Sequence, residues 1–533
     1  MKKIKAINIP PHITKGNDGR YILDSYSKVI EFILCTLNDD AIQLSDCVLI
    51  PSSDIVAFDI SDLYKCASEK GLAERIGISD KGQNSFIISK RIICNNCVLK
   101  KAMLCNIEFE KYVGFENSIL EDIHFTNSIF TGSLGISTSQ VFGYVSCERI
   151  FAKSIFLHNM TYNGADFNFT YSQIKSISIL SSTLKYDEET LLEAQEKPNL
   201  ILSDFNFAYS HLDEVHISHL KTELYLWFLN ACITNNILIT NCSFTKGLIF
   251  EGCIIRGKQS IIQSNDLTRT SQIKTIRLNG CKLDSDLLIF GVLCDCMEAQ
   301  DCRVATSGRL SIFHSNINYI YFERASIYGE LNINHINANS KLQTKDSCVI
   351  NMECAINLGN INIRLDNISV VNYDTAKILR LASQKLNNSI EVTILKAIEH
   401  KLYFEEYKFK FSYTSISDYL LLWLNKVSNN FGTNWLAGCI FCLVISIIFL
   451  GLIGLSMDEY SFCMPPTQWV IFTKEYWIKT FEFLWLPYLD SFNNMISNPK
   501  CTAWSVLFYI VGKSLIAYGI FQTIVAFRKY CNK

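Results

Sequence analysis

A small side chain followed two residues later by a large one recurs about every five residues over residues 97–130. The large members step by five, with one step of six between Phe109 and Phe115. Neither the 3.6-residue period of a helix nor the 2.0-residue period of a strand produces this spacing. A chain that turns a corner every five residues does, so the pattern predicts a β-solenoid, a rod wound from stacked coils. The pairs are Cys97/Leu99, Ala102/Leu104, Ile107/Phe109, Val113/Phe115, Ser118/Leu120, Ile123/Phe125 and Ser128/Phe130.

The composition fits a water-exposed protein with a minority of membrane-embedded residues. Hydrophobic residues make up 49% of the 533, and the mean hydropathy is +0.16. The formal net charge is only −2, so no basic surface is evident and nucleic acid is not an expected partner.

The cysteines indicate the compartment of the rod. There are 21, and several, including Cys97, Cys242 and Cys253, occupy the small position of the repeat. A free cysteine behaves there as a small buried hydrophobe, and so many unpaired thiols favour a reducing compartment. The N-terminal segment MKKIKAINIPPHITKGNDGR lacks the apolar stretch of a secretory signal. We therefore expect the rod to lie in the cytosol.

The repeat divides the chain into four predicted parts. Residues 1–90 lack it and predict an α/β cap, with helices over 25–37 and 61–76. Residues 91–370 predict the solenoid, at roughly 20 residues per four-sided coil and at most roughly 14 coils, with ten to twelve favoured because insertions interrupt it. Residues 371–430 have helical periodicity and predict a hairpin and a juxtamembrane helix. The insertions are 185–199, 256–272 and 338–347, and such loops often carry binding functions.

Residues 431–533 predict a transmembrane helical hairpin. The segments 435–455 and 504–527 are long and apolar enough to span about 30 Å of hydrocarbon. Basic residues precede the first span and follow the second, whereas acidic residues outnumber lysines in the intervening loop. The positive-inside rule therefore places both termini in the cytoplasm, in a multi-pass protein of the inner (plasma) membrane.

The loop between the spans is rich in aromatic residues over 469–489. It can lie along the outer membrane surface as an interfacial helix, dip in as a re-entrant pore loop, or fold as an ectodomain. Cys463 and Cys501 are its only cysteines, and they predict either a disulfide or two free thiols. Lys513 is the one charge inside the second span, where a charge usually faces protein, water or an acidic partner.

The triplets Ala165-Asp166-Phe167 and Ser203-Asp204-Phe205 resemble the core motif of pentapeptide-repeat proteins. The resemblance covers residues 91–370 and implies a right-handed coil in which the small and the large residue both point inward. The end of the chain is similar to that of bacterial pentapeptide-repeat membrane proteins, in which a helical hairpin precedes a few spans. This family has no catalytic motif to transfer, and its acidic DNA-mimicking members differ from this nearly neutral chain.

No motif points to an enzyme, a cofactor or a metal site. Nucleotide-binding, hydrolase and HExxH patterns do not occur, and the lone pair Cys94/Cys97 lacks the second pair that a structural zinc site requires. The first functional hypothesis is therefore a membrane-anchored solenoid that binds an unknown protein partner on its surface. The alternative is a sensor–effector whose spans homo-oligomerise into a pore or membrane-disrupting element, favoured by Lys513 and by glycines in both spans.

Overall fold

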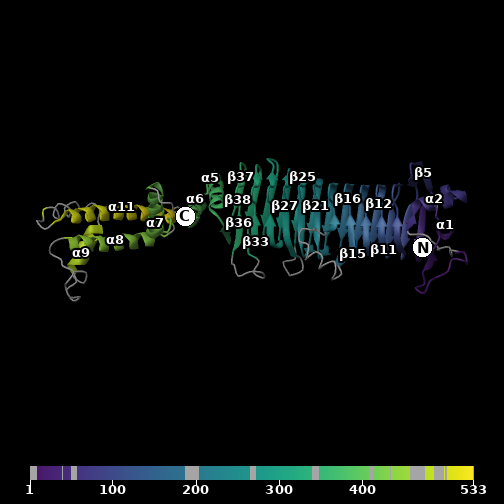
Figure 1. Ribbon diagram of the computed structural model, residues 1–533, viewed down its shortest axis with the longest axis horizontal. Helices are drawn as coiled ribbons and strands as arrows, with labels where there is room; N and C mark the ends of the chain where they lie inside the picture. Colours follow the sequence, from purple (N-terminus) through teal and green to yellow (C-terminus); the bar gives the residue numbers. More distant parts are fainter. Residues whose placement is uncertain are drawn as a thin grey trace. The chain divides into compact units, whose positions relative to one another are not determined.

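The computed structural model divides into two compact units, Met1–Ser369 and Val370–Lys533 (Figure 1). The first is a parallel β-solenoid of about 14 turns with a helical cap, and the second is helical. The residues that the structure describes are 9–38, 40–49, 57–185, 203–264, 272–338, 347–365, 367–406, 413–432, 434–456, 474–484, 497 and 501–531.

Two sheets form the walls of the solenoid, and their strands pair in parallel with strands of neighbouring turns, except for the antiparallel pair β5–β6 near the N-terminal end. Within the described part of the chain, the first sheet consists of β1 (Tyr21–Leu23), β3 (Cys47–Leu49), β4 (Phe58–Asp59), β8 (Val98–Met103), β11 (Ile119–His124), β13 (Gln140–Ser146), β15 (Thr161–Asn168), β17 (Thr183–Lys185), β18 (Ser203–Asn206), β20 (Lys221–Thr222), β21 (Tyr225–Leu229), β23 (Ser243–Phe244), β24 (Gly247–Glu251), β27 (Gln272–Asn279), β30 (Leu293–Glu298), β33 (Asn316–Tyr321), β36 (Cys348–Asn351) and β39 (Ile368–Val370).

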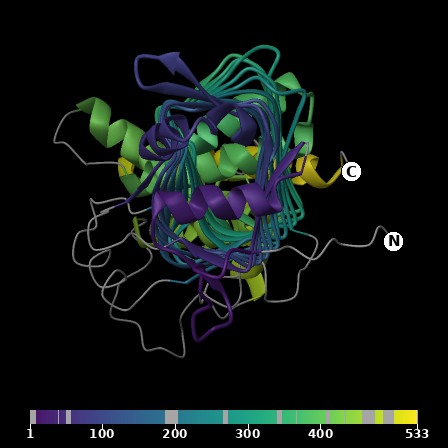
Figure 2. The same ribbon diagram turned by 90° about the vertical axis from the view of Figure 1, so that its right-hand side faces the viewer.

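The second sheet faces the first across the core (Figure 2). It consists of β2 (Ala41–Ser45), β5 (Ile78–Gly82), β6 (Ser85–Ile88), β7 (Arg91–Asn95), β9 (Ile107–Phe109), β10 (Val113–Glu116), β12 (Ile129–Ser137), β14 (Phe151–His158), β16 (Gln173–Leu180), β19 (His211–Ser218), β22 (Cys232–Thr240), β25 (Ile254–Ile255), β26 (Gln259–Gln263), β28 (Lys282–Leu283), β29 (Asp286–Phe290), β31 (Arg303–Val304), β32 (Arg309–Phe313), β34 (Ser326–Ile327), β35 (Glu330–Asn334), β37 (Ile356–Asn357) and β38 (Asn360–Ile363).

Buried apolar side chains form continuous columns from turn to turn, as the repeat predicts. In one column, Phe115 pairs with Ile136 of the next turn, and Ile239 pairs with Ile262 of the next turn. Each of these turns contains more than 20 residues, so the predicted length of 20 residues per coil is too short. The column also begins at Leu44, so one turn lies inside the segment 1–90 that the sequence predicts as a cap. Its members are Leu44, Cys94, Phe115, Ile136, Leu157, Ile179, Ile217, Ile239, Ile262, Ile289, Ile312, Ile333 and Ile363.

The extra residues of each turn lie at the corners. A residue with left-handed backbone precedes the small buried residue, as in Asn96 (φ 55°) before Cys97 and Asn241 (φ 53°) before Cys242. Asparagine tolerates this conformation better than most residues, which explains the frequent Asn-Cys and Asn-Ser pairs. Burial raises the pKa of Cys242 and of Cys302 to about 12, so these thiols act as small apolar side chains.

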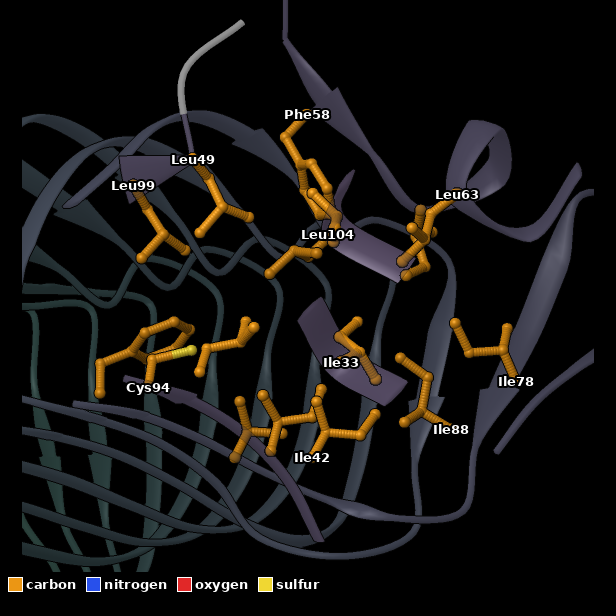
Figure 3. Close-up of a pocket in the computed structure, with 16 residues that line it drawn as sticks. Ile33, Ile42, Leu49, Phe58, Leu63, Ile78, Ile88, Cys94, Leu99 and Leu104 are labelled. Carbon is orange, nitrogen blue, oxygen red and sulfur yellow. The ribbon is translucent and has the colours of Figure 1, made fainter. Parts of the chain in front are cut away.

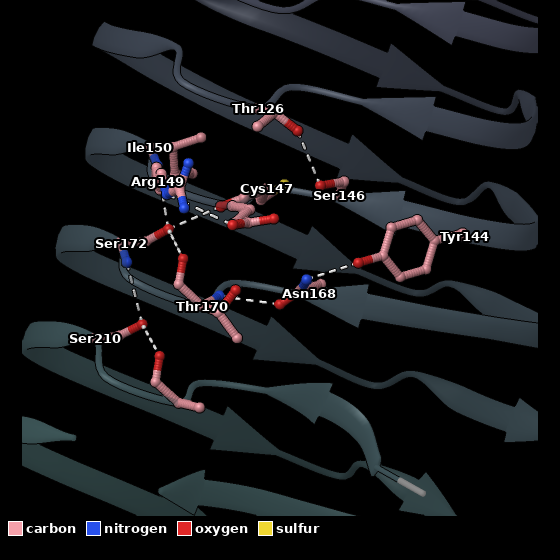
Figure 4. A network of polar contacts seen from close by, with 12 residues as sticks. Thr126, Tyr144, Ser146, Cys147, Arg149, Ile150, Asn168, Thr170, Ser172 and Ser210 are labelled. Atoms are coloured by element: carbon pink, nitrogen blue, oxygen red, sulfur yellow. Dashed lines mark hydrogen bonds and ion pairs between the residues drawn. The ribbon is translucent and has the colours of Figure 1, made fainter. Parts of the chain in front are cut away.

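Buried serines at the small position join consecutive turns (Figure 4). The Ser172 hydroxyl accepts a hydrogen bond from the Ile150 amide at 3.1 Å and donates to the Cys147 carbonyl at 2.7 Å. The Ser172 amide in turn donates to the Ser210 hydroxyl at 3.3 Å. The serine hydroxyls thus accept hydrogen bonds from backbone amides at the corners, which would otherwise be buried without a partner.

Helices cover the N-terminal end of the solenoid core. They are α1 (Tyr26–Thr36), α2 (Ile60–Glu69) and α3 (Ala73–Ile76), and the Ser25 hydroxyl caps α1 by accepting from the Lys28 amide. An apolar cavity of about 60 Å³ remains between this cap and the first turns, and its lining includes Ile33 of α1 together with Ile42 and Leu99 of the two sheets (Figure 3).

The second unit consists, within its described residues, of α5 (Tyr373–Lys385), α6 (Ser389–Glu406), α7 (Tyr413–Asn429), α8 (Trp435–Ser456), α9 (Lys474–Leu484) and α11 (Ala503–Cys531). Helices α5 and α6 form a hairpin in which the Arg380 guanidinium pairs with the largely buried Glu399 carboxylate at 2.5 Å. Phe431, which follows α7, packs against Phe404 of α6. The segment 371–430 is thus helical in its described residues, as predicted, whereas a position of α7 beside a membrane stays a prediction.

Candidate functional site

Helices α8 and α11 pack against each other as a hairpin, and glycines permit their close approach. A Cβ atom on Gly512 would lie 2.8 Å from the Phe449 Cβ, and one on Gly519 would lie 2.5 Å from the Cys442 sulfur. Small residues at such contacts are typical of helices that associate in lipid.

The hairpin leaves most of its apolar surface uncovered. Trp435–Ser456 and Ala503–Phe527 are long and apolar enough to cross a membrane, with mean hydropathies of 2.9 and 1.6, yet only 28% and 22% of these segments are buried. Large side chains such as Ile440 and Phe521 are more than half exposed. Both helices are thus largely uncovered by the described part of the chain, which weakly suggests membrane association.

Polar contacts close both ends of the hairpin. At one end the Ser456 and Ser505 hydroxyls lie 2.8 Å apart. At the other end the Asn429 amide donates to the Gln522 side-chain oxygen at 2.7 Å, and the Tyr518 hydroxyl donates to Asn425 at 2.9 Å. The apolar stretch between these polar ends fits the length of a bilayer core.

Lys513 lies inside this apolar stretch and contacts α9. Its ammonium donates a hydrogen bond to the Phe483 carbonyl at 2.7 Å and lies 5.0 Å from the centre of the Phe483 ring. The Phe483 carbonyl belongs to the last described turn of α9, and the negative end of a helix dipole favours a cation. Lys513 therefore holds the C-terminal end of α9 against α11.

The contacts of Phe483 also fix how far α9 reaches along the hairpin. The ring packs with Ile453 and Ile516, and it lies beside Gly512, which is nine residues, or ~14 Å, beyond the start of α11. The Phe483 ring thus packs against both α8 and α11. The three predicted placements of the aromatic loop stay predictions.

The remaining predicted site residues have different outcomes. Cys501 lies directly before α11, but Cys463 lies outside the described residues, so their disulfide stays a prediction. Cys94 and Cys97 both belong to the solenoid core, with the Cys97 sulfur 3.4 Å from that of Cys47. Among the described residues, no group of three His, Cys, Asp or Glu side chains could hold a metal ion.

The outer face of the first sheet carries a column that the sequence analysis missed. It runs over seven consecutive turns, and its register can be found only by aligning turns of unequal length. Its members are Asn206, Trp227, Ile249, Arg277, Glu298, Tyr321 and Asn351. Ile249 and Asn351 are buried, at 2% and 7% exposure, and the Trp227 indole nitrogen is buried as well, so only part of the column meets solvent. Tryptophan, tyrosine and arginine are the residue types that dominate protein interfaces.

Residues next to the three insertions lie at regular intervals in the first sheet. Thr183 precedes the first insertion, Gln272 follows the masked part of the second in sequence and Asn337 precedes the third, and each is three turns from the next in the sheet register. Because parallel strands stack at about 4.8 Å, these three residues are roughly 14 Å apart along the solenoid.

Comparisons with known proteins add little. No protein-family model matches the sequence, and no curated protein matches it significantly. Among solved structures, the periplasmic alginate epimerase AlgG and a point mutant of it are similar to this chain at 10% sequence identity and a TM-score of 0.20. Both alignments cover 65% of this chain and 88% of the epimerase.

Proposed function

We propose that this protein is a solenoid scaffold fixed to the inner (plasma) membrane by α8 and α11, with both termini in the cytoplasm, and that the solenoid binds a protein partner without catalysis. The uncovered apolar surface of the hairpin carries this proposal, since less than a third of either segment is buried. Water would penalise that surface by about 25 cal/mol for each Å², whereas a bilayer would cover it.

The half-buried members of the outer column, Trp227, Arg277 and Tyr321, are the proposed centre of the partner surface. Rigid neighbouring turns hold these side chains at fixed spacing, so binding would order few groups that are mobile beforehand. The insertions next to strands of the same sheet would extend the surface sideways. The proposal therefore predicts binding on the outer face of the first sheet and not on the second sheet.

We infer further that the solenoid is a degenerate, right-handed member of the pentapeptide-repeat class from a bacterium. The inward orientation of both members of the small-x-large pairs supports this, as for Cys97 and Leu99, which are 0% and 4% exposed. The corner residues that lengthen each turn beyond four fives are the main departure from a square coil.

Membrane extraction tests the anchor. After alkaline carbonate treatment, we expect the full chain to stay in the membrane pellet and a chain ending at residue 430 to appear in the soluble fraction. A fluorescent protein fused to the C-terminus should be protected from external protease in intact cells. Recovery of the full chain in the soluble fraction would refute the anchor.

Photo-crosslinking tests the partner surface. A benzoylphenylalanine in place of Tyr321 should give a discrete protein adduct in cells. The same group in place of Lys153, an exposed position on the other sheet, is the matched control and should not. An adduct from position 153 alone, or from neither position in a folded, membrane-bound protein, would contradict the proposed surface.

A pore is the second candidate function, and the contact of α9 with both apolar helices favours it. Re-entrant helices line conduction paths in many channels. Purified protein in a planar bilayer would then show stepwise current that Lys513→Met alters. A silent bilayer containing oligomeric protein would eliminate this candidate.

A further inference from the structure

We propose that α7 is a further membrane-binding element, and that the lipid surface covers an apolar stripe on its outward side. This inference rests on the proposed membrane anchor and adds a second contact with the same bilayer. The stripe follows the helix at spacings of four, three and four residues, so its side chains lie on one side. Its members are Ile416, Leu420, Trp423 and Val427, which are 46%, 54%, 44% and 44% exposed.

The opposite side of α7 faces the protein and is mostly polar. The Asn429 amide donates to the Gln522 side-chain oxygen of α11, and Asn425 accepts from the Tyr518 hydroxyl. Leu422, the buried apolar residue on this side, packs against α6. A helix on the surface of a soluble protein has the reverse arrangement, with its apolar side toward the core and its polar side toward water. The outward side of α7 is therefore suited to an apolar environment.

The position of α7 places this stripe at one end of the proposed anchor. Asn425 and Asn429 contact the end of the hairpin opposite the Ser456–Ser505 contact, and only residues 430–434 separate α7 from α8. Figure 1 shows α7 lying across the axes of α8 and α11. Because these two helices would span the bilayer, α7 would run along its cytoplasmic surface and not through it.

A phospholipid surface fits the stripe better than a protein partner does. Even fully exposed, four side chains cannot supply the roughly 800 Å² that each partner contributes to a typical stable protein interface. Tryptophan prefers the headgroup level of a membrane, and aliphatic side chains of an interfacial helix reach the acyl boundary. The anchor also holds the bilayer beside α7, so a weak contact is sufficient for binding.

Binding of α7 would also hold the α5–α6 hairpin next to the bilayer. The Lys426 ammonium of α7 lies 4.6 Å from the centre of the Phe404 ring of α6, and Leu422 belongs to the same apolar cluster as Ala397 of α6. These contacts join the inward side of α7 to α6. The helices that precede the membrane segments would thus be fixed at the surface and not only tethered to it.

Photo-crosslinking to lipid tests the stripe. The full chain is reconstituted in liposomes of phosphatidylethanolamine and phosphatidylglycerol, with benzoylphenylalanine in place of Leu420. Intact mass spectrometry should then show chains that are heavier by one phospholipid. The matched control carries the same group in place of Asp418, which is exposed but lies four residues before the inward Leu422. Its lipid adduct should be lower by about fivefold or more, since the apolar side of an interfacial helix is the side that enters the bilayer.

Benzoylphenylalanine in place of Val444 of α8 separates this inference from the anchor. A lipid adduct at position 444 without one at position 420 would overturn the α7 contact and leave the anchor intact, whereas no adduct at either position would refute both. A protein adduct at position 420, within the chain or between chains, would overturn the lipid contact, and so would equal lipid adducts at positions 418 and 420. If the Leu420 variant fails to fold, the same group in place of Trp423 decides, because it exchanges one aromatic side chain for another.

Discussion

Removal of one ring from the aromatic ladder of the solenoid is the sharpest test of how turns stabilise one another. Phe228 stacks on Phe207 at 4.9 Å and on Phe250 at 4.8 Å between ring centres, with planes within 10°. It is 0% exposed. Phe228→Ala deletes a ring held on both sides by other rings, so neighbouring side chains have little room to fill the space.

The expected cost is the usual ~3–5 kcal/mol for truncating a buried phenylalanine, which includes the lost transfer free energy and the cavity. We take ~4 kcal/mol, because each stacked pair contributes a further ~0.5–1.5 kcal/mol. Since about 1.4 kcal/mol is a tenfold change in an equilibrium constant, local opening around β21 should become on the order of 10³-fold more frequent.

Hydrogen exchange followed by mass spectrometry on the full chain in detergent measures this opening turn by turn. Exchange should rise over 203–206, 225–229 and 247–251 and fade within a few turns, because each turn of a solenoid contacts only its neighbours. Phe151→Ala, on the same solenoid but 52% exposed, should change exchange by less than about threefold. Uniform exchange along the whole solenoid, or an effect no larger than that of Phe151→Ala, would refute the nearest-neighbour reasoning.

Three further outcomes are expected. Ser172→Ala leaves the Ile150 amide without its hydrogen-bond acceptor and should destabilise the adjoining turns by ~1–3 kcal/mol. Ser172→Cys should cost less, because cysteine occupies the same small position at other corners. Local hydrogen exchange distinguishes the two variants. Lys513→Met should free the end of α9 and speed exchange over 474–484 by about tenfold or more, with Lys513→Arg close to the natural protein. Burial lowers the pKa of His400, which faces Lys396, Glu399 and Arg380, below its usual value, so the unfolded state takes up a proton first as pH falls through ~6.5. Stability should therefore decrease below that pH, and His400→Gln should flatten this dependence in thermal unfolding scans.

The sequence predicts the solenoid because its evidence is local. A small residue at a corner and a large one two residues later, such as Cys97 and Leu99, identify the inward side chains directly. The turn length is harder to predict, because the left-handed residue before each corner, such as Asn96, adds a residue without changing the apolar pattern. Columns on the outer face depend on that length, so Trp227 and Tyr321 could not be aligned from the pattern alone.

The candidate site in the helical unit was predicted in part. A lone charge in an apolar segment, Lys513, is visible in the sequence. Its contact is a backbone carbonyl 30 residues away, and a carbonyl has no residue-specific pattern to find.

The exposed residues of the hairpin permit one substitution whose sign separates a membrane helix from a soluble one. Val444 lies near the middle of α8 and is 43% exposed. In water, Val444→Asp would replace an exposed apolar side chain by a charge and leave stability within about 0.5 kcal/mol. At the centre of a bilayer the same change costs about 3 kcal/mol on insertion scales, so the membrane-bound fraction should fall and the remainder should be degraded or aggregate. Ile356→Asp, at a 52% exposed position of the solenoid, is the control and should leave membrane binding intact. Equal behaviour of the two variants would mean that α8 meets water, and the anchor would then have to be abandoned.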